Sequence, residues 1–316
     1  MKRLFWNSSE RRLRSLWRLL LTSFMAFVLS MATLYALRSL NLSNRSSVFI
    51  APCLILASVV ASVWIAARVL DRRPLSQFGL SLDRKWWTDL LFGLFLGGFL
   101  ASVVFLIQWV IGWVEITGWF QHIDTEESFG TVIASYFVFA ICVGIHEELA
   151  YRGYLLRNIA EGMNFAVVGP SRSLVLAVTI TSLAFALAHA VNPNISVAGL
   201  VNTVLAGFVY GLPFLLTGRL GLPIGIHITW NFFQGPVFGF NVSGVGFGGS
   251  VMSTAKSGPT LWTGGDYGFE GGLLATAMLI IALPLMFGWI YLRYGSITID
   301  KCLAQPPNAT ASQSDE

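Results

Sequence analysis

Ionisable and strongly polar residues are rare within the apolar stretches of this sequence, and the few present form three short groups. They are Glu147, Glu148 and Arg152 in the segment GIHEELAYR, then His189 at the end of FALAH, then His227 and Asn231 in HITWN. An ionisable group at membrane depth is costly, and it usually faces a bundle interior or a water-filled cavity. These residues are therefore the first candidates for chemistry.

The spacing of the first group predicts how its side chains are directed. Residues four apart lie on one face of a helix, so Glu148 can pair with Arg152 as an internal ion pair. Glu147 lies about 100° around the helix from Glu148 and is then free to point elsewhere. The segment begins like the zinc motif HExxH, but Ala150 stands where that motif needs its second histidine. A zinc site of that type is therefore excluded.

The two later groups follow the same spacing rule. His227 and Asn231 project from one face of their helix, and Phe185 lies one turn before His189, where it can wall the imidazole. A carboxylate, two imidazoles and an amide that converge in a bundle supply a base, two electrophiles or ligands, and a hydrogen-bond donor. These are the groups needed to add water to a carbonyl. Each group alone has a structural explanation in helix packing, but their joint occurrence is harder to explain in that way.

The elements that must position these residues are apolar helices. Of the 316 residues 55% are hydrophobic and 11% are charged, and the mean hydropathy is +0.68. Soluble domains carry about 25% charged residues. The three cysteines show no pairing or zinc-binding pattern. The net charge of +4 comes without the alternation of aromatic and basic residues that marks a nucleic-acid surface. The composition predicts an integral membrane protein with no nucleic-acid partner.

Eight stretches are candidates to cross the membrane, which takes about 20 mostly apolar residues. Uncharged stretches occur at 19–37, 48–67, 90–114, 173–190, 195–217, 222–239 and 273–292, and a shorter one occurs at 130–145. The helical pattern of the shorter stretch continues as far as Arg152. Because these runs are apolar on all sides, barrel strands are excluded. We predict an all-α integral membrane protein, a bundle of eight transmembrane helices around a polar cavity within the membrane.

The basic residues predict the orientation, because cytoplasmic loops collect positive charge. If the N-terminus lies inside, only Arg38, Arg45 and Lys256 of the 20 Lys and Arg residues fall outside the cytoplasmic segments. Six acidic residues lie in the predicted outer loops. The sequence therefore predicts a multi-pass protein of the plasma membrane with both termini in the cytoplasm.

Within this layout we expect three regions. Residues 1–18 form a basic, amphipathic cytoplasmic N-terminus, residues 19–294 form the eight-helix membrane domain, and residues 295–316 form a disordered cytoplasmic tail. The glycine-rich stretch 235–271 is expected to be a long flexible outer loop that is partly re-entrant. The polar residues of interest all lie within 145–231.

The predicted depths of the two buried histidines disagree. Counted from the inner helix ends, His189 lies about 16 residues deep and His227 about 5, which is a mismatch of roughly 16 Å. A tilt, a kink at Pro223, or an earlier start of the helix that carries His189 can each absorb it. Because Glu147 and His227 lie toward the inner side, we expect the cavity to open to the cytoplasm.

Three motifs together carry a resemblance to a known family. EExxxR at 147–152, FxxxH at 185–189 and HxxxN at 227–231, in this order on three hydrophobic helices, resemble the CPBP family. These are intramembrane endopeptidases related to the type II CAAX prenyl proteases, and they are also called Abi proteins. The resemblance implies the same eight-helix layout over most of the chain.

The resemblance also implies roles for the individual residues. Glu147 would be the general base that activates water, and His189 would assist it or position the water. His227 and Asn231 would form the oxyanion hole, while Glu148, Arg152 and Phe185 would support the site. The implied partners are membrane lipid and a peptide or protein substrate, which can be lipidated at a CAAX-like end.

Other interpretations remain open at this point. Glu147, His189 and His227 are a workable zinc set with one open position. We favour metal-free chemistry and assign no cofactor, because Asn231 is a poor zinc ligand and a good oxyanion donor. A non-proteolytic immunity or scaffold protein with the same constellation is one alternative. A proton-coupled transporter that uses the buried acid and histidines as a relay is another.

Overall fold

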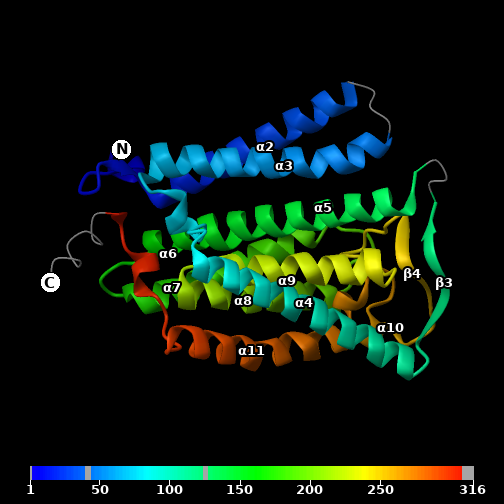
Figure 1. Cartoon of the computed structure of the whole chain (residues 1–316). Coiled ribbons are helices and arrows are strands. Elements are labelled where there is room, and N and C mark those ends of the chain that lie inside the picture. Colours follow the sequence, from blue (N-terminus) through cyan, green and yellow to red (C-terminus); the bar gives the residue numbers. More distant parts are fainter. Residues whose placement is uncertain (1, 40–43, 124–126, 308–316) are drawn as a thin grey trace.

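The long helices of the protein lie side by side along one common direction, and a small β-sheet lies at one end of the bundle (Figure 1). The structure is a computed structural model, and it describes residues 2–39, 44–123 and 127–307. Each of the eight apolar stretches in the sequence forms a helix. A helix satisfies all of its backbone polar groups internally, as lipid surroundings require.

Successive long helices along the chain run in opposite directions (Figure 1). The long helices are α2 (Ser15–Ser39), α3 (Asn44–Ala66), α4 (Arg84–Val110), α5 (Phe129–Glu147), α7 (Gly169–His189), α8 (Val197–Thr217), α9 (Gly221–Phe232) and α11 (Leu273–Tyr294). The π-helical segments are η1 (Ala67–Asp71), η3 (Glu148–Leu156) and η4 (Phe233–Val237). The short elements are α1 (Lys2–Phe5), η2 (Leu75–Phe78), α6 (Arg157–Met163), α10 (Thr260–Thr263), η5 (Gly265–Tyr267), η6 (Phe269–Gly271) and η7 (Lys301–Ala304).

Seven helical segments of the described chain are long and apolar enough to cross a membrane, so the predicted count of eight is not confirmed. The difference lies in the stretch 222–239. It forms α9, of 12 residues, which continues for only five more as η4. Every residue of α9 from Gly221 to Asn231 is buried. The helix therefore lies inside the bundle and is covered by protein.

Close packing against α4 holds α9 in the centre of the bundle. A Cβ atom added to Gly97 of α4 would lie 2.3 Å from the carbonyl oxygen of Ile226, and one added to Gly225 of α9 would lie 2.4 Å from that of Leu90. Small residues allow two helix backbones to approach closely in membrane proteins. The position of α9, and of the polar residues it carries, is thus fixed by backbone contact with α4.

The glycine-rich stretch 235–271 does not form the flexible loop that was predicted. It includes strand β4 (Gly249–Lys256), which pairs antiparallel with β3 (Val114–His122). After the short elements α10, η5 and η6 the chain enters α11. The chain is mostly helical, in agreement with the expected all-α class, and at this end of the molecule backbone groups outside the helices are satisfied by strand pairing.

The opposite end of the bundle carries α1, the short strands β1 (Trp6–Asn7) and β2 (Arg12–Leu13), and η7 (Figure 1). Buried ion pairs tie the elements together here. Arg18 of α2 binds Asp71 at 2.7 Å and Glu161 of α6 at 2.5 Å, and Arg73 also binds Glu161 at 2.7 Å. This end is therefore well packed.

The tail also differs from the prediction of disorder after residue 294. Leu303 and Ala304, in η7, are 2% and 0% exposed, and the Asn164 side chain donates a hydrogen bond of 2.9 Å to the carbonyl of Ala304. The polar composition of the tail did not indicate that Leu303 and Ala304 are buried. Residues 308–316, the remainder of the predicted tail, lie outside the described residues.

Candidate active site

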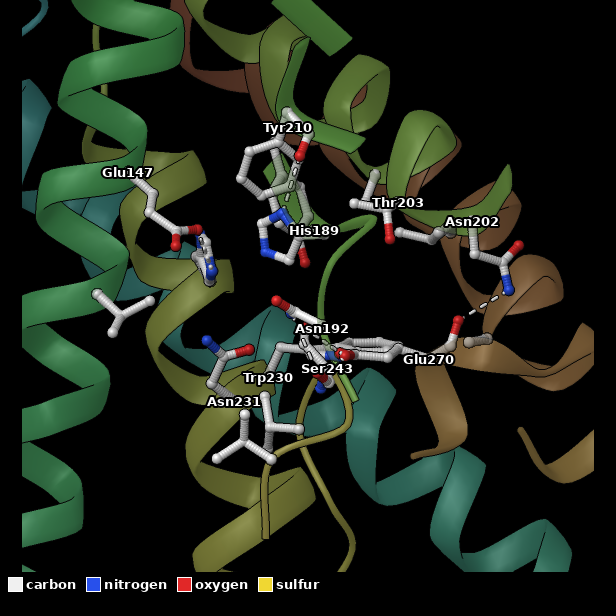
Figure 2. Close-up of a pocket in the computed structure, with 18 of the residues that line it drawn as sticks. Glu147, His189, Asn192, Asn202, Thr203, Tyr210, Trp230, Asn231, Ser243 and Glu270 are labelled. Atoms are coloured by element: carbon white, nitrogen blue, oxygen red, sulfur yellow. Dashed lines mark hydrogen bonds and ion pairs between the residues drawn. The ribbon is translucent and has the colours of Figure 1, made fainter. Parts of the chain in front are cut away.

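All four predicted catalytic residues line one cavity of about 200 Å³. Glu147 ends α5, His189 ends α7, and His227 and Asn231 lie on α9. In Figure 2 the side chains of Glu147, His189 and Asn231 point toward a common space. Residues far apart in the sequence are thus brought together as expected.

Glu148 holds two neighbours with a single carboxylate oxygen. Its Oε1 accepts a hydrogen bond of 2.9 Å from Arg152, so the predicted ion pair is confirmed. The same oxygen lies 2.8 Å from Nδ1 of His227, a contact between η3 and α9 that helical spacing could not predict. Glu148 is 0% exposed. The side chain therefore fixes the orientation of the His227 ring.

Glu147 faces the cavity from the other side of the same ring. Its Oε2 lies 3.7 Å from Nε2 of His227, which is too far for a hydrogen bond. This oxygen is buried and has no hydrogen-bond partner among the described residues. Glu147 thus points away from Arg152, as predicted, and its carboxylate is not held by a neighbouring donor.

His189 is oriented by the backbone of its own helix. Its Nδ1 lies 2.8 Å from the carbonyl oxygen of Phe185, which can only accept, so Nδ1 carries the hydrogen. In the neutral ring Nε2 is then an acceptor. The Phe185 ring lies 4.5 Å from the His189 ring and 6.4 Å from the His227 ring, measured between centroids. The predicted aromatic wall is confirmed, and it touches both imidazoles.

The predicted depth mismatch between His189 and His227 is therefore wrong, because one phenyl ring contacts both. The count assumed that each helix starts at the membrane surface. The first residues of α9, from Gly221 onward, are instead buried in protein. The amide of Leu220, just before α9, donates to the carbonyl of Gly79 at 3.0 Å. Helix α9 thus begins below the surface of the bundle.

Asn231 lies one turn beyond His227 and is 8% exposed. Among the described residues its amide makes no hydrogen bond within the protein. A buried amide normally has such a partner. The Asn231 amide is therefore available to a ligand in the cavity.

Sequence reasoning missed the residues that close the cavity from the glycine-rich stretch. Glu270 accepts hydrogen bonds from the backbone amide and from the hydroxyl of Ser243, the latter at 2.6 Å. Asn202 holds the Glu270 carbonyl at 2.9 Å (Figure 2). Burial raises the pKa of the Glu270 carboxyl, whereas the Ser243 hydrogen bonds and the nearby His189 ring lower it. The available signal was that Glu270 is one of only two acidic residues, with Asp266, in the apolar, glycine-rich stretch 235–271.

We expected the cavity to open at the end of the bundle that carries the termini. In the structure it opens at the other end. Asn192, Ser243, Val245 and Phe247, which line it, belong to loops at the end that carries β3 and β4. The expectation took Glu147 to lie near an inner helix end. In the structure α5 continues through η3 and α6 to Met163, so Glu147 lies near the middle of a 35-residue helical segment.

Within the described part of the chain, no group of three or more His, Cys, Asp or Glu side chains is placed to hold a metal. In the set of Glu147, His189 and His227 that was considered for zinc, Nδ1 of His227 faces Glu148 and Nδ1 of His189 faces a backbone carbonyl, so Nε2 is the ring nitrogen of each that could bind a ligand.

A comparison with protein-family models gives one match. Residues 129–233 match the model described as Type II CAAX prenyl endopeptidase Rce1-like. Comparisons with curated proteins and with solved structures give no significant match. The matched segment runs from α5 to the start of η4 and includes Glu147, His189, His227 and Asn231. About a third of the chain is thus similar to type II CAAX prenyl endopeptidase Rce1-like proteins, a protease family, and the apolar helices indicate a multi-pass membrane protein.

Proposed function

We propose that this protein is an intramembrane endopeptidase in which Glu147 activates water. The observation that carries the proposal is the unpartnered Oε2 of Glu147, buried in the cavity 3.7 Å from Nε2 of His227. A carboxylate that no protein donor holds can accept a proton from a water molecule beside it. The family match to a protease supports the same reaction class.

The two hydrogen-bond acceptors of the site lie on two different helices, α5 and α7. Glu147 on α5 and Nε2 of His189 on α7 can both accept hydrogen bonds from a water molecule between them. As that water attacks the carbonyl carbon of the substrate, its proton passes to Glu147. Glu147 then donates the proton to the leaving amine as the peptide bond breaks.

The two donors both lie on α9. The Asn231 amide and Nε2–H of His227 would bind the oxygen that becomes negative in the tetrahedral intermediate. Nδ1 of His227 already faces the Glu148 carboxylate, so an Nε2–H donor requires the imidazolium form. An imidazolium would balance the local charge, because two carboxylates, Glu147 and Glu148, would then face two cations, His227 and Arg152.

The proposed substrate is a membrane-associated peptide or protein, which can carry a lipid near its end. Apolar side chains line much of the cavity and suit such a peptide: Phe139, Val143, Phe185, Ala206 and Leu279. We place the protein in the plasma membrane, and the distribution of its basic residues supports an orientation with both termini in the cytoplasm.

The proposal is tested by cleavage of membrane-anchored peptides after reconstitution of the full chain in lipid vesicles. We expect Glu147→Gln, His189→Ala and His227→Ala each to abolish cleavage while the protein stays folded and inserted. Loss of one oxyanion donor in Asn231→Ala should slow cleavage by about 10²–10³-fold. Glu115→Gln, at an exposed position on β3, is the matched control and should cleave normally.

Cleavage by Glu147→Gln at the wild-type rate would overturn the mechanism. A wild-type protein that cleaves no peptide would favour the scaffold or transporter alternatives. The same assay is run with a chelator, and cleavage should persist because no metal is required. Activity that a chelator abolishes and zinc restores would instead show a metallopeptidase.

A further inference from the structure

We infer that the cavity is entered from the end of the bundle that carries β3 and β4, and that this end faces away from the cytoplasm. The substrate would then be a peptide segment presented on the outer side of the membrane. Cleavage of such a substrate rests on the proposed function, whereas the direction of access stands independently of it.

The route from the other end of the bundle is closed by packed side chains. Beyond the contacts of Glu148 lies a layer of residues that are each 0% exposed: Leu149, Tyr154, Leu156, Phe214 and Leu220. They come from η3, from the end of α8 and from the link into α9, all on the side of the termini. Protein interiors are packed as densely as organic crystals. A peptide therefore has no path to Glu147 from this side.

The route from the β3–β4 end leads through partly exposed residues that line the same cavity. Val245 lines the cavity and is 49% exposed, so it links the site to the surface of the protein. Asn192, in the loop directly after His189, also lines the cavity and is half-buried. The side chain of Asn192 is bonded to the carbonyl of Ser243 at 3.1 Å. These loops form the rim of the entrance.

The basic residues indicate which end lies in the cytoplasm. Several segments that carry basic residues lie at the end of the bundle that holds the termini (Figure 1). They are the starts of α2, α4 and α7, the end of η1, the α8–α9 link and the end of α11. Of the Lys and Arg residues that the structure describes, Arg38, Arg45 and Lys256 lie at the other end, and Arg152 is buried within the bundle. Cytoplasmic segments carry the excess of Lys and Arg. The entrance is therefore on the side opposite the cytoplasm.

The test is thiol labelling of the full chain in cells, for which the chain supplies its own control. Cys302 is exposed and lies at the end of the termini, whereas Cys53 and Cys142 are at least partly buried between α3 and α5. A membrane-impermeant maleimide should leave the wild-type protein unlabelled in intact cells and label Cys302 in inside-out vesicles. This result would establish the orientation.

The entrance itself is tested with Val245→Cys and, as a second position, Val191→Cys, whose valine is 88% exposed. Both variants should be labelled in intact cells from which any outer barrier has been removed. Labelling of either variant only in inside-out vesicles would overturn the inference. Val245→Cys that is labelled from neither side would also contradict it, because the rim would then be closed to water.

A second measurement connects the entrance to the reaction. Val245→Cys that has been modified from outside with a bulky impermeant reagent should lose most of its cleavage, compared with the same variant before modification. A substrate with its cleavage site on the outer side should be cut, and one with the site in the cytoplasm should not. If no substrate is cut by any form, the proposed function fails, while the labelling pattern still decides the direction of access.

Discussion

At the scale of the residue, Glu148 is the side chain that assembles the site. One of its carboxylate oxygens binds both Arg152 and His227, and it is 0% exposed. Its neighbour Glu147 lines the cavity, and its buried Oε2 has no hydrogen-bond partner in the described part of the chain. Adjacent residues of the same type are thus assigned to support and to chemistry by the direction in which the helix points them. The two roles should separate when each residue is removed.

We expect Glu148→Ala to lower both the yield of folded protein and its melting temperature in detergent. The change leaves Arg152 buried without its partner, and breaking a buried ion pair in this way costs about 3–5 kcal/mol. Glu147→Ala should keep the wild-type melting temperature and lose only cleavage. Glu115→Ala, at an exposed position, is the control for removal of a carboxylate. Equal melting temperatures for Glu148→Ala and the wild type would contradict the supporting role.

At the scale of the element, the contact of α4 with α9 places the two proposed oxyanion donors. Gly93 and Gly97 on α4 and Gly225 on α9 leave no space for a Cβ atom at the contact. The His227 ring and the Asn231 amide follow Gly225 on the same helix. Any separation of the two backbones would therefore displace both donors from the cavity.

Adding a methyl group at the contact between α4 and α9 tests whether this close approach positions the two donors. In Gly225→Ala the new Cβ would meet backbone atoms of α4, and overpacking of this kind costs about 1–3 kcal/mol. We expect a lower melting temperature together with slower cleavage. Gly288→Ala in α11 is the matched control, because a Cβ there has nothing within 4 Å. A decrease of the same size in both variants would show that close approach at Gly225 is not the cause.

At the scale of the whole molecule, segments outside the membrane helices complete the bundle at both ends. The stretch that carries Ser243 and Glu270 closes the cavity, and η7 covers the opposite end near α6 and α7. Leu303 of η7 joins the same buried cluster as Leu149 and Phe214. The C-terminal segment thus belongs to the layer that seals the site from the side of the termini.

Truncation of that anchor should destabilise the protein. Leu303→Ala removes a buried side chain and should cost about 2–5 kcal/mol, seen as a lower melting temperature. Ile297→Ala, at a position that is 45% exposed, is the control and should change the melting temperature little. A disordered tail, as the composition suggested, would give no difference between the two variants.

The sequence alone determined the features that depend on local spacing and composition. The eight apolar stretches are all helical, Glu148 pairs with Arg152, and Phe185 walls His189, because each follows from lipid solvation or from the helical repeat. The sequence also predicted that Glu147, His189, His227 and Asn231 lie together, because polar residues at membrane depth usually face the interior of the same helix bundle.

Only the tertiary structure decided what depends on contacts between distant segments. Helix α9 is buried beside α4, Glu148 reaches His227, and the glycine-rich stretch brings Glu270 to the cavity. The side on which the cavity opens was decided in the same way, by a sealing layer drawn from η3, α8 and η7. Periodicity in one helix states which residues share a face, but not which face of another element will cover them.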